Sequence, residues 1–219
     1  MMINDKVLKG LSVLITIGLI FSCNQAKHSK ISHRSVIFHD TIIRDCNYSF
    51  EEAISGSKAP DYILNQLQLI EVKYISFDRK THLGQLLVNK TIAIELKQIF
   101  EIMYKQRFPI AHVIPIVKYN WDDYKSMQSN NTYCFCYRDV YYSKHALGLA
   151  VDINPYLNPV RYKPPYGYRP ALPIGAQYNP EALGTFTMHS EIVLKFKELG
   201  FLWGHYFKHK YDDHHFEKK

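Results

Sequence analysis

The sequence predicts an α+β fold in which a small antiparallel or mixed sheet is flanked by helices. Two spacings of the hydrophobic residues indicate this. Apolar residues recur at helical spacing in residues 91–105 and 190–199, and they alternate with polar residues in 69–77 and 148–154. The chain has 219 residues, of which 47% are hydrophobic and 21% charged, which is typical of one globular domain with a normal core.

The N-terminal segment has the features of an export signal. Lys6 and Lys9 precede an apolar run, residues 11–21, that is too short to span a bilayer comfortably. The run ends in Ser22-Cys23 and resembles a bacterial lipobox, which implies a signal peptide over residues 1–22 and a lipid on Cys23. An ordinary cleaved signal and an uncleaved anchor are the alternatives.

Residues 23–45 are polar with little periodicity and are expected to form a tether that holds the domain, residues 46–219, off the membrane. The histidines of the tether, His28, His33 and His39, are expected to be solvated, because nothing there implies a fixed geometry. These features predict an exported lipoprotein of the bacterial cell envelope, facing the periplasm or the outer surface, and a monomer.

The charge balance favours an anionic surface as the surroundings. The formal net charge is +7 and the isoelectric point is near 9.1. Nucleic acid, cell wall and membrane are all polyanionic, but the lysines are scattered and no nucleic-acid motif is present. We therefore expect the cell envelope and no nucleic-acid partner.

The first half of the chain is expected to alternate between short elements. Asp61 is expected to cap a short helix, residues 62–67, which precedes the strand at 69–77. The helix at 91–105 has an apolar stripe for core packing, and Phe108-Pro109 ends it.

Residues 111–117 then favour a β-rich segment, and Asp122-Asp123 are expected in the loop that follows, as solvated acids. In the helix at 190–199, Ser190 or His189 is expected as the cap and Gly200 as the stop.

Residues 155–180 are rich in Pro and Tyr and leave little room for a helix. Long irregular segments in compact domains are often binding loops or lids. The tyrosines either wall a substrate groove or pack the loop onto its own domain; they are Tyr156, Tyr162, Tyr166 and Tyr168.

A candidate metal site begins in residues 143–152, where His145 and Asp152 stand seven positions apart with the small residues Gly148 and Ala150 between them. The expected strand turns Asp152 away from its apolar neighbours, and an unpaired buried carboxylate costs several kcal/mol. A cation or a dense set of donors must therefore face it, and we predict His145 and Asp152 as ligands of one Zn²⁺.

Catalytic zinc usually takes three protein ligands and leaves a fourth position open. The third candidate is His215, which follows Asp212 by three residues, so both side chains can reach one point. A carboxylate that is near the metal without binding it suits a general base, which is the predicted role of Asp212. The rival histidines are His189, His205, His209 and His214. His214 is expected to point to the opposite side if this segment is a strand.

Three cysteines follow Cys23: Cys46, Cys134 and Cys136. Export makes one disulfide possible, between Cys46 and either Cys134 or Cys136, with one thiol left over. A zinc site built on Cys134, Cys136 and His145 is an alternative that no second cysteine pair supports.

The two motifs together, residues 143–152 and 212–217, resemble the zinc D-alanyl-D-alanine carboxypeptidase family, which also includes D-Ala-D-Ala dipeptidases and L-alanyl-D-glutamate endopeptidases. The similarity extends from about Tyr62 to the C-terminus. It implies a hedgehog-like fold with the zinc site on the sheet, His145, Asp152 and His215 as ligands of one zinc ion, and Asp212 as the base.

The resemblance also implies that Arg138 binds substrate and stabilises the oxyanion, although a surface arginine stacked on Tyr137 is the simpler alternative. Ser143 either hydrogen-bonds near the first ligand or caps the turn. One departure is visible, since the family often has Trp-Gly-Gly where this chain has Trp203-Gly204-His205.

These features together predict a zinc-dependent peptidase that hydrolyses peptidoglycan stem peptides, as a D,D-carboxypeptidase or an endopeptidase. One alternative is a non-catalytic cell-wall-binding lipoprotein of the same fold. Another is a basic, aromatic nucleic-acid binder, which the export signal disfavours.

Overall fold

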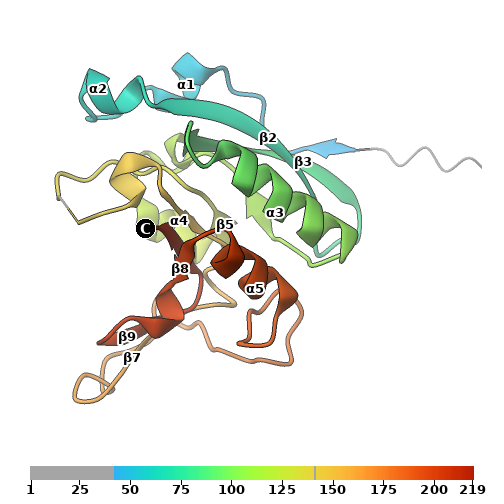
Figure 1. Cartoon of the computed structure of the whole chain (residues 1–219), viewed down its shortest axis with the longest axis vertical. Helices are drawn as coiled ribbons and strands as arrows, with labels where there is room; N and C mark the ends of the chain where they lie inside the picture. Colours follow the sequence, from blue (N-terminus) through green and yellow to red (C-terminus); the bar gives the residue numbers. More distant parts are fainter. Residues whose placement is uncertain (1–41, 141) are drawn as a thin grey trace, which may run out of the picture. The chain divides into compact units, whose positions relative to one another are not determined.

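A long β-hairpin with one helix packed along it forms the first half of the domain (Figure 1). The computed structural model describes residues 42–140 and 142–219, and these all fall within one compact unit. The predicted signal peptide, the lipidation site Cys23 and most of the tether lie outside the described residues, as do His28, His33 and His39. None of the helices in the described part of the chain has the length and apolar character needed to cross a membrane.

The structure is α+β, with several small sheets where one had been expected. The strands are β1 (Ile43–Arg44), β2 (Leu67–Ile75), β3 (Thr81–Asn89), β4 (His112–Val113), β5 (Asn131–Thr132), β6 (Ala150–Asp152), β7 (Val160–Tyr162), β8 (Phe201–Trp203), β9 (Lys210–Asp212) and β10 (His215–Lys218). The helices are α1 (Phe50–Ile54), α2 (Asp61–Leu64), α3 (Ala93–Lys105), α4 (Asp123–Gln128) and α5 (Glu191–Glu198), with 3₁₀ turns η1 (Ile116–Tyr119), η2 (His145–Leu147) and η3 (Gly204–Tyr206).

The first sheet has the order β1-β3-β2. Strands β2 and β3 pair antiparallel along their whole length, and β1 pairs parallel with β3. The α3 helix lies against β2 and buries the apolar stripe that the sequence predicts, including Leu96, Ile99, Phe100 and Met103. At Gly84 of β3 an added Cβ would lie 2.4 Å from the Val113 carbonyl oxygen, so this position is a close crossing of two strands.

The second sheet has the order β6-β10-β8 and is antiparallel. Phe216 of β10 stacks on Phe196 of α5 with ring centroids 3.9 Å apart, and both side chains are fully buried. This sheet therefore shares one hydrophobic core with the hairpin and α3. Two further two-stranded sheets, β4-β5 and β7-β9, complete the described fold.

Several local predictions are confirmed. The strand expected at 69–77 is β2 and the helix expected at 91–105 is α3. The helix expected at 190–199 is α5, which follows Ser190 and is stopped by Gly200 at φ +82°.

Three local predictions are wrong. The β-rich segment expected at 111–117 is reduced to two residues, because Pro115 lacks an N–H and leads into η1. Asp122 and Asp123 are not in a loop, since the Asp122 side chain accepts a hydrogen bond from the Lys125 amide and caps α4. Asp61 is the first residue of α2 and does not cap it.

Candidate metal centre and active-site cleft

Three buried side chains from distant parts of the chain meet at one point. His145 Nε2 lies 3.1 Å from Asp152 Oδ1 and 3.1 Å from His215 Nδ1, and His215 Nδ1 lies 3.0 Å from Asp152 Oδ1. The three donor atoms thus form a nearly equilateral triangle, with each side chain at most 10% exposed. This group could hold a metal ion.

A strand pairing and a tight turn bring the three side chains of the triangle together. Strand β6 pairs with β10 in a register that sets Asp152 directly opposite His215. His145 begins η2, and Gly148 ends that turn at φ +67°, a conformation that glycine adopts without strain. A Cβ at Gly148 would also lie 2.7 Å from Leu67 Cδ2, so glycine is required here for space as well.

The second nitrogen of each imidazole is fixed by an oxygen that can only accept a hydrogen bond. His145 Nδ1 donates to the Cys134 carbonyl oxygen at 2.6 Å, and His215 Nε2 donates to Glu217 Oε2 at 3.0 Å. These bonds leave Nε2 of His145 and Nδ1 of His215 facing the triangle. Metal-binding histidines typically have such partners, which orient the ring and fix its tautomer.

The electrostatics of the triangle favour a cation. Burial alone would raise the pKa of Asp152, but the charges of His145 and His214 and the hydrogen bonds from His145 and His215 hold it well below its usual value. Burial lowers the pKa of His215, yet its hydrogen bonds to Asp152 and Glu217 outweigh burial and raise the pKa to about 10. Positive charge is thus stabilised at this point, either as a proton or as a metal ion.

Asp212 lies beside the triangle at the end of β9. Burial raises its pKa, but the positive charges of His214, His215 and Lys210 lower it below the usual value. Lys210 Nζ donates to Asp212 Oδ2 at 2.7 Å, whereas Asp212 Oδ1 is buried and receives no hydrogen bond. One carboxylate oxygen is therefore held by Lys210, and the other, which has no hydrogen bond, lies 3.0 Å from His214 Nε2.

Close packing under the site depends on Gly204. A Cβ at this position would lie 2.6 Å from the Asp212 carbonyl oxygen and 3.1 Å from His215 Cβ. The first glycine of the expected Trp-Gly-Gly motif thus has a steric role. In place of the second glycine, His205 stacks on Trp203 with centroids 4.5 Å apart, and its Nδ1 lies 2.6 Å from Asp213 Oδ1.

The position predicted for His214 is wrong. It was expected on the side opposite His215, but its Nε2 lies 3.0 Å from Asp212 Oδ1 and 3.7 Å from Asp152 Oδ2. Strand alternation does not apply, because β9 ends at Asp212 and a tight turn precedes β10. His214 Nδ1 donates to the Asn158 carbonyl oxygen at 2.7 Å, which holds the ring against both carboxylates.

The other rival histidines are elsewhere. His189 is exposed just before α5. The His209 ring contacts Tyr166 beside the β7–β9 sheet, which projects at the lower left of Figure 1. Neither belongs to the triangle.

Arg138 and Ser143 both line the cleft that contains the triangle. Arg138 Nη2 donates to Asp123 Oδ2 at 2.6 Å and to the Tyr133 hydroxyl at 3.4 Å. The Arg138 side chain also interacts with the Cys136 thiol. Ser143 Oγ accepts a hydrogen bond from the Ala146 amide of η2 at 3.4 Å.

The cleft has a volume of about 590 Å³, and the triangle and Asp212 form part of its wall. Of the four loop tyrosines, Tyr162 lines it, whereas Tyr156, Tyr166 and Tyr168 do not. The titratable groups and the cavity thus coincide, which is the usual arrangement of an active site.

The cysteine thiols are not members of the triangle. Cys46, Cys134 and Cys136 are all free thiols in the structure, so the possible disulfide is not formed. Cys134 Sγ donates to the Gly148 carbonyl oxygen, and Cys136 Sγ lies 3.8 Å from the Trp121 carbonyl oxygen. The two thiols are therefore directed at backbone carbonyls, which argues against the alternative zinc site on Cys134 and Cys136.

Residues 138–218 match a family model described as D-alanyl-D-alanine carboxypeptidase. The match spans both motifs, so the resemblance is confirmed for this part of the chain; residues 62–137 lie outside it. No curated protein and no solved structure matches significantly.

Proposed function

Because residues 138–218 match a family of D-alanyl-D-alanine carboxypeptidases, we propose that the protein is a zinc-dependent peptidase that hydrolyses peptidoglycan stem peptides. The observation that carries the proposal is the triangle of His145, Asp152 and His215 in the wall of a cleft, with Asp212 beside it. The family match, the possible metal site and Asp212 all fall within residues 138–218.

The donor set fits zinc. Two imidazole nitrogens and one carboxylate oxygen are ordinary zinc ligands, and a tetrahedral ion with bonds of about 2.0–2.1 Å has its ligand atoms about 3.3 Å apart. The triangle edges of 3.0 to 3.1 Å are close to that value. Zn²⁺ bound there would supply a Lewis acid that polarises the scissile carbonyl and lowers the pKa of water.

Asp212 is the general base in this proposal. Lys210 holds its Oδ2, and its Oδ1, beside His214, accepts the proton of the attacking water and then delivers it to the leaving amine. Lys210 and His214 keep the carboxylate ionised before the reaction, because both stabilise its negative charge.

Arg138 positions the substrate. Asp123 and Tyr133 fix its Nη2, and its guanidinium lines the cleft, where it would donate to a peptide carbonyl or carboxylate. Donors that act on the developing oxyanion are worth roughly 3–4 kcal/mol in comparable sites.

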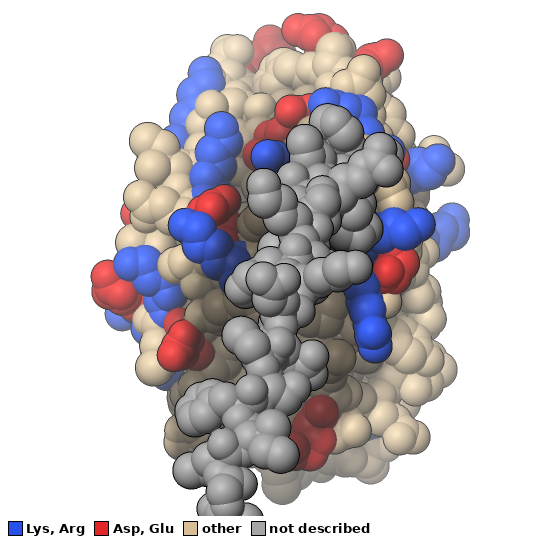
Figure 2. Space-filling model, turned by 90° about the vertical axis from the view of Figure 1, so that its right-hand side faces the viewer, with Lys and Arg blue, Asp and Glu red and all other residues tan. Residues whose placement is uncertain are grey.

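The cellular setting is part of the proposal. The lipobox-like sequence at Cys23 supports a lipid anchor, and the scattered positive charge suits an anionic envelope. Lys and Arg side chains are spread over the face seen in Figure 2 with acidic residues between them, which does not favour a nucleic-acid groove. We therefore place the enzyme at the bacterial cell envelope, as a monomer acting on peptidoglycan.

The test uses purified protein and defined muropeptides, with zinc added or chelated. Turnover is expected with zinc and is lost with chelator. Asp212→Asn should retain zinc, measured as metal content, while turnover falls by about 10²- to 10⁴-fold. Asp61→Asn, at an exposed carboxylate of α2, is the matched control and should retain both.

Full activity in Asp212→Asn would show that the base is another group. Muropeptides that bind to the zinc-loaded protein but remain uncut would support the non-catalytic wall-binding alternative.

A further inference from the structure

Tyr133 contacts both the metal triangle and Arg138. It follows β5, and its amide donates to the Asp152 carbonyl oxygen at 3.2 Å, while the Asp152 amide donates to the Tyr133 carbonyl oxygen at 2.9 Å. This antiparallel bridge is a second pairing for β6, which also pairs with β10. The backbone of Tyr133 therefore helps to fix the Asp152 corner of the triangle.

The Tyr133 ring lies against a second corner of the triangle, His145. The two rings are stacked, with centroids 5.1 Å apart and an angle of 26° between their planes. The hydrogen bond from His145 Nδ1 to the Cys134 carbonyl oxygen still allows the imidazole to turn about that bond. A ring stacked on its face opposes this rotation and so keeps His145 Nε2 directed at the triangle.

The hydroxyl at the far end of the Tyr133 ring binds Arg138. Arg138 Nη2 donates to this hydroxyl at 3.4 Å and to Asp123 Oδ2 at 2.6 Å. The bond to Asp123 is the shorter one and compensates the charge of the guanidinium. The hydroxyl is a second point of contact, which limits how the guanidinium can turn about the ion pair. Tyr133 and Arg138 both line the cleft.

Packing alone does not account for a tyrosine at this position. The side chain is 1% exposed and belongs to a small buried cluster with Ile116 and Cys136. Phenylalanine would fill the same space without the free-energy cost of burying a hydroxyl. That hydroxyl makes its hydrogen bond to the arginine that lines the cleft, which indicates a role in orienting Arg138.

We propose that Tyr133 is a positioning residue that holds Arg138 in a fixed relation to the metal triangle. Its backbone and ring contact two of the predicted zinc ligands, and its hydroxyl contacts the guanidinium. A substrate oxygen bound by Arg138 is thereby placed at a constant distance from the metal position. This inference rests on the proposed function and adds a residue to it, since Tyr133 lies outside both sequence motifs and before the matched residues 138–218.

The first experiment removes the hydroxyl and keeps the ring. Tyr133→Phe should raise KM for a muropeptide about threefold to tenfold and change kcat by less than about twofold, because one hydrogen bond to a charged group is lost. Zinc affinity should stay at the wild-type value. Steady-state kinetics and zinc titration by calorimetry measure these quantities. An unchanged KM, or a loss of zinc binding in Tyr133→Phe, would overturn the inference.

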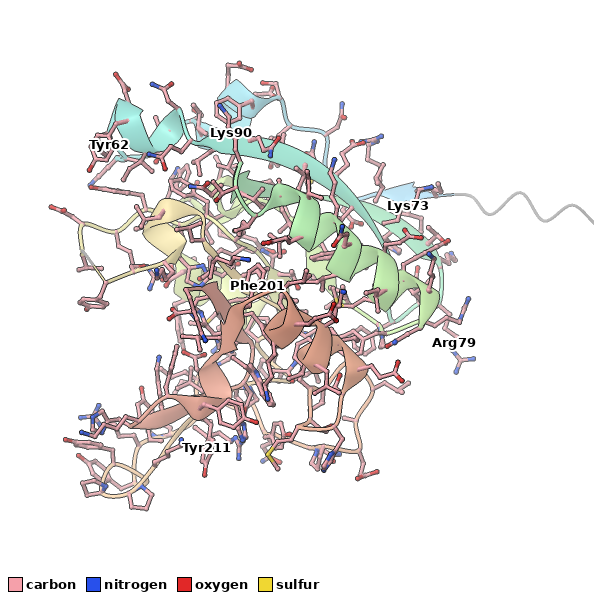
Figure 3. The ribbon with its side chains drawn as sticks, in the orientation of Figure 1. Tyr62, Lys73, Arg79, Lys90, Phe201 and Tyr211 are labelled. Atoms are coloured by element: carbon pink, nitrogen blue, oxygen red, sulfur yellow. The ribbon has the colours of Figure 1, made fainter. Side chains whose placement is uncertain are left out.

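Two other tyrosines are matched controls. The Tyr178 hydroxyl donates to the Phe186 carbonyl oxygen at 2.8 Å, and Tyr178 does not line the cleft. Tyr62 is exposed on α2, at the upper left of Figure 3. Tyr178→Phe and Tyr62→Phe should keep the KM and the zinc affinity of the wild type. A wild type that cuts no muropeptide would contradict the proposed function, whereas an active wild type with the same KM as Tyr133→Phe would overturn this inference alone.

The second experiment removes the ring as well. Tyr133→Leu should weaken zinc binding about tenfold relative to Tyr133→Phe, because the stacked ring no longer orients His145. Zinc titration by calorimetry compares the two variants. Equal zinc affinity would show that the ring does not hold His145, which would remove the link between the arginine and the triangle.

The third experiment shows whether the hydroxyl acts through Arg138. In the Asp212→Asn background, muropeptide binding is measured by calorimetry, so that no turnover is needed. Tyr133→Phe should weaken binding about threefold to tenfold when Arg138 is present, and by less than about 1.5-fold in Arg138→Met. The same loss in both backgrounds would show that the hydroxyl acts elsewhere, and would overturn the inference.

Discussion

His145 Nε2 lies 3.1 Å from His215 Nδ1, although 70 positions separate the two residues in the sequence. Both rings are directed at this point by their second nitrogens, one bonded to a backbone carbonyl and the other to Glu217. Two lone pairs facing each other at this distance repel unless a cation lies between them. The arrangement is therefore set for a metal ion or a proton.

The first prediction concerns metal binding. His215→Ala removes one corner of the triangle and should weaken zinc affinity by more than about 100-fold, since even partners of metal ligands contribute 10- to 100-fold. His205→Ala is the matched control, because His205 is bonded to Asp213 and stacked on Trp203. Zinc titration by calorimetry measures both. Equal affinity in the two variants would exclude His215 as a ligand.

The second prediction concerns Glu217, which lies 3.0 Å from His215 Nε2. Glu217→Ala should lower zinc affinity by about 10- to 100-fold, and Glu217→Gln by less, because the amide oxygen still accepts the hydrogen bond. Glu198→Gln on the exposed side of α5 serves as the control. Affinity that is unchanged in Glu217→Ala would mean that the carboxylate does not orient the ring.

The third prediction concerns Gly204. Gly204→Ala places a Cβ 2.6 Å from the Asp212 carbonyl oxygen and should lower the free energy of unfolding by about 1–3 kcal/mol, with weaker zinc binding as well. Gly167→Ala is the control, since its Cβ meets nothing closer than 3.7 Å. Urea denaturation with chelator present separates folding from metal binding. Equal stability of the two variants would show that β9 and β10 can move away from η3 without loss of stability.

The fourth prediction concerns pH and His82. Burial lowers the pKa of His82, but hydrogen bonds to Asp45 and Asp78 outweigh burial and raise it above 6.5. A histidine pKa that is higher in the folded than in the unfolded state stabilises the fold at low pH. The stabilisation is complete below the unfolded-state pKa and is lost as the pH rises through the folded-state pKa. The stability difference between wild type and His82→Gln should therefore be largest near pH 5 and shrink above neutrality, as measured by urea denaturation with chelator present. A difference that grows with pH would contradict the assignment.

The sequence predicted the helices and strands whose hydrophobic pattern extends over many residues. The stripe of α3 and the alternation of β2 each extend over at least nine residues, and the structure has both. The strand at Asp152 is only three residues long, yet it was predicted because Val151 and Ile153 are core residues on its other face.

The features that the sequence did not predict depend on contacts between distant segments. The turn at His214 follows from the pairing of β9 with β7, which fixes Asp212 opposite Val160. The ion pair of Asp123 with Arg138 requires α4 to lie beside a segment fifteen residues further along, and no local spacing encodes that.

The position of β10 in the chain determines when the triangle can form during synthesis. This strand lies between β6 and β8, carries His215, and is the last described element that a ribosome would release. Every other described element emerges earlier, yet none of them can complete the ligand set. A chain to which β10 has not yet been added therefore lacks His215 and cannot form the triangle with His145 and Asp152.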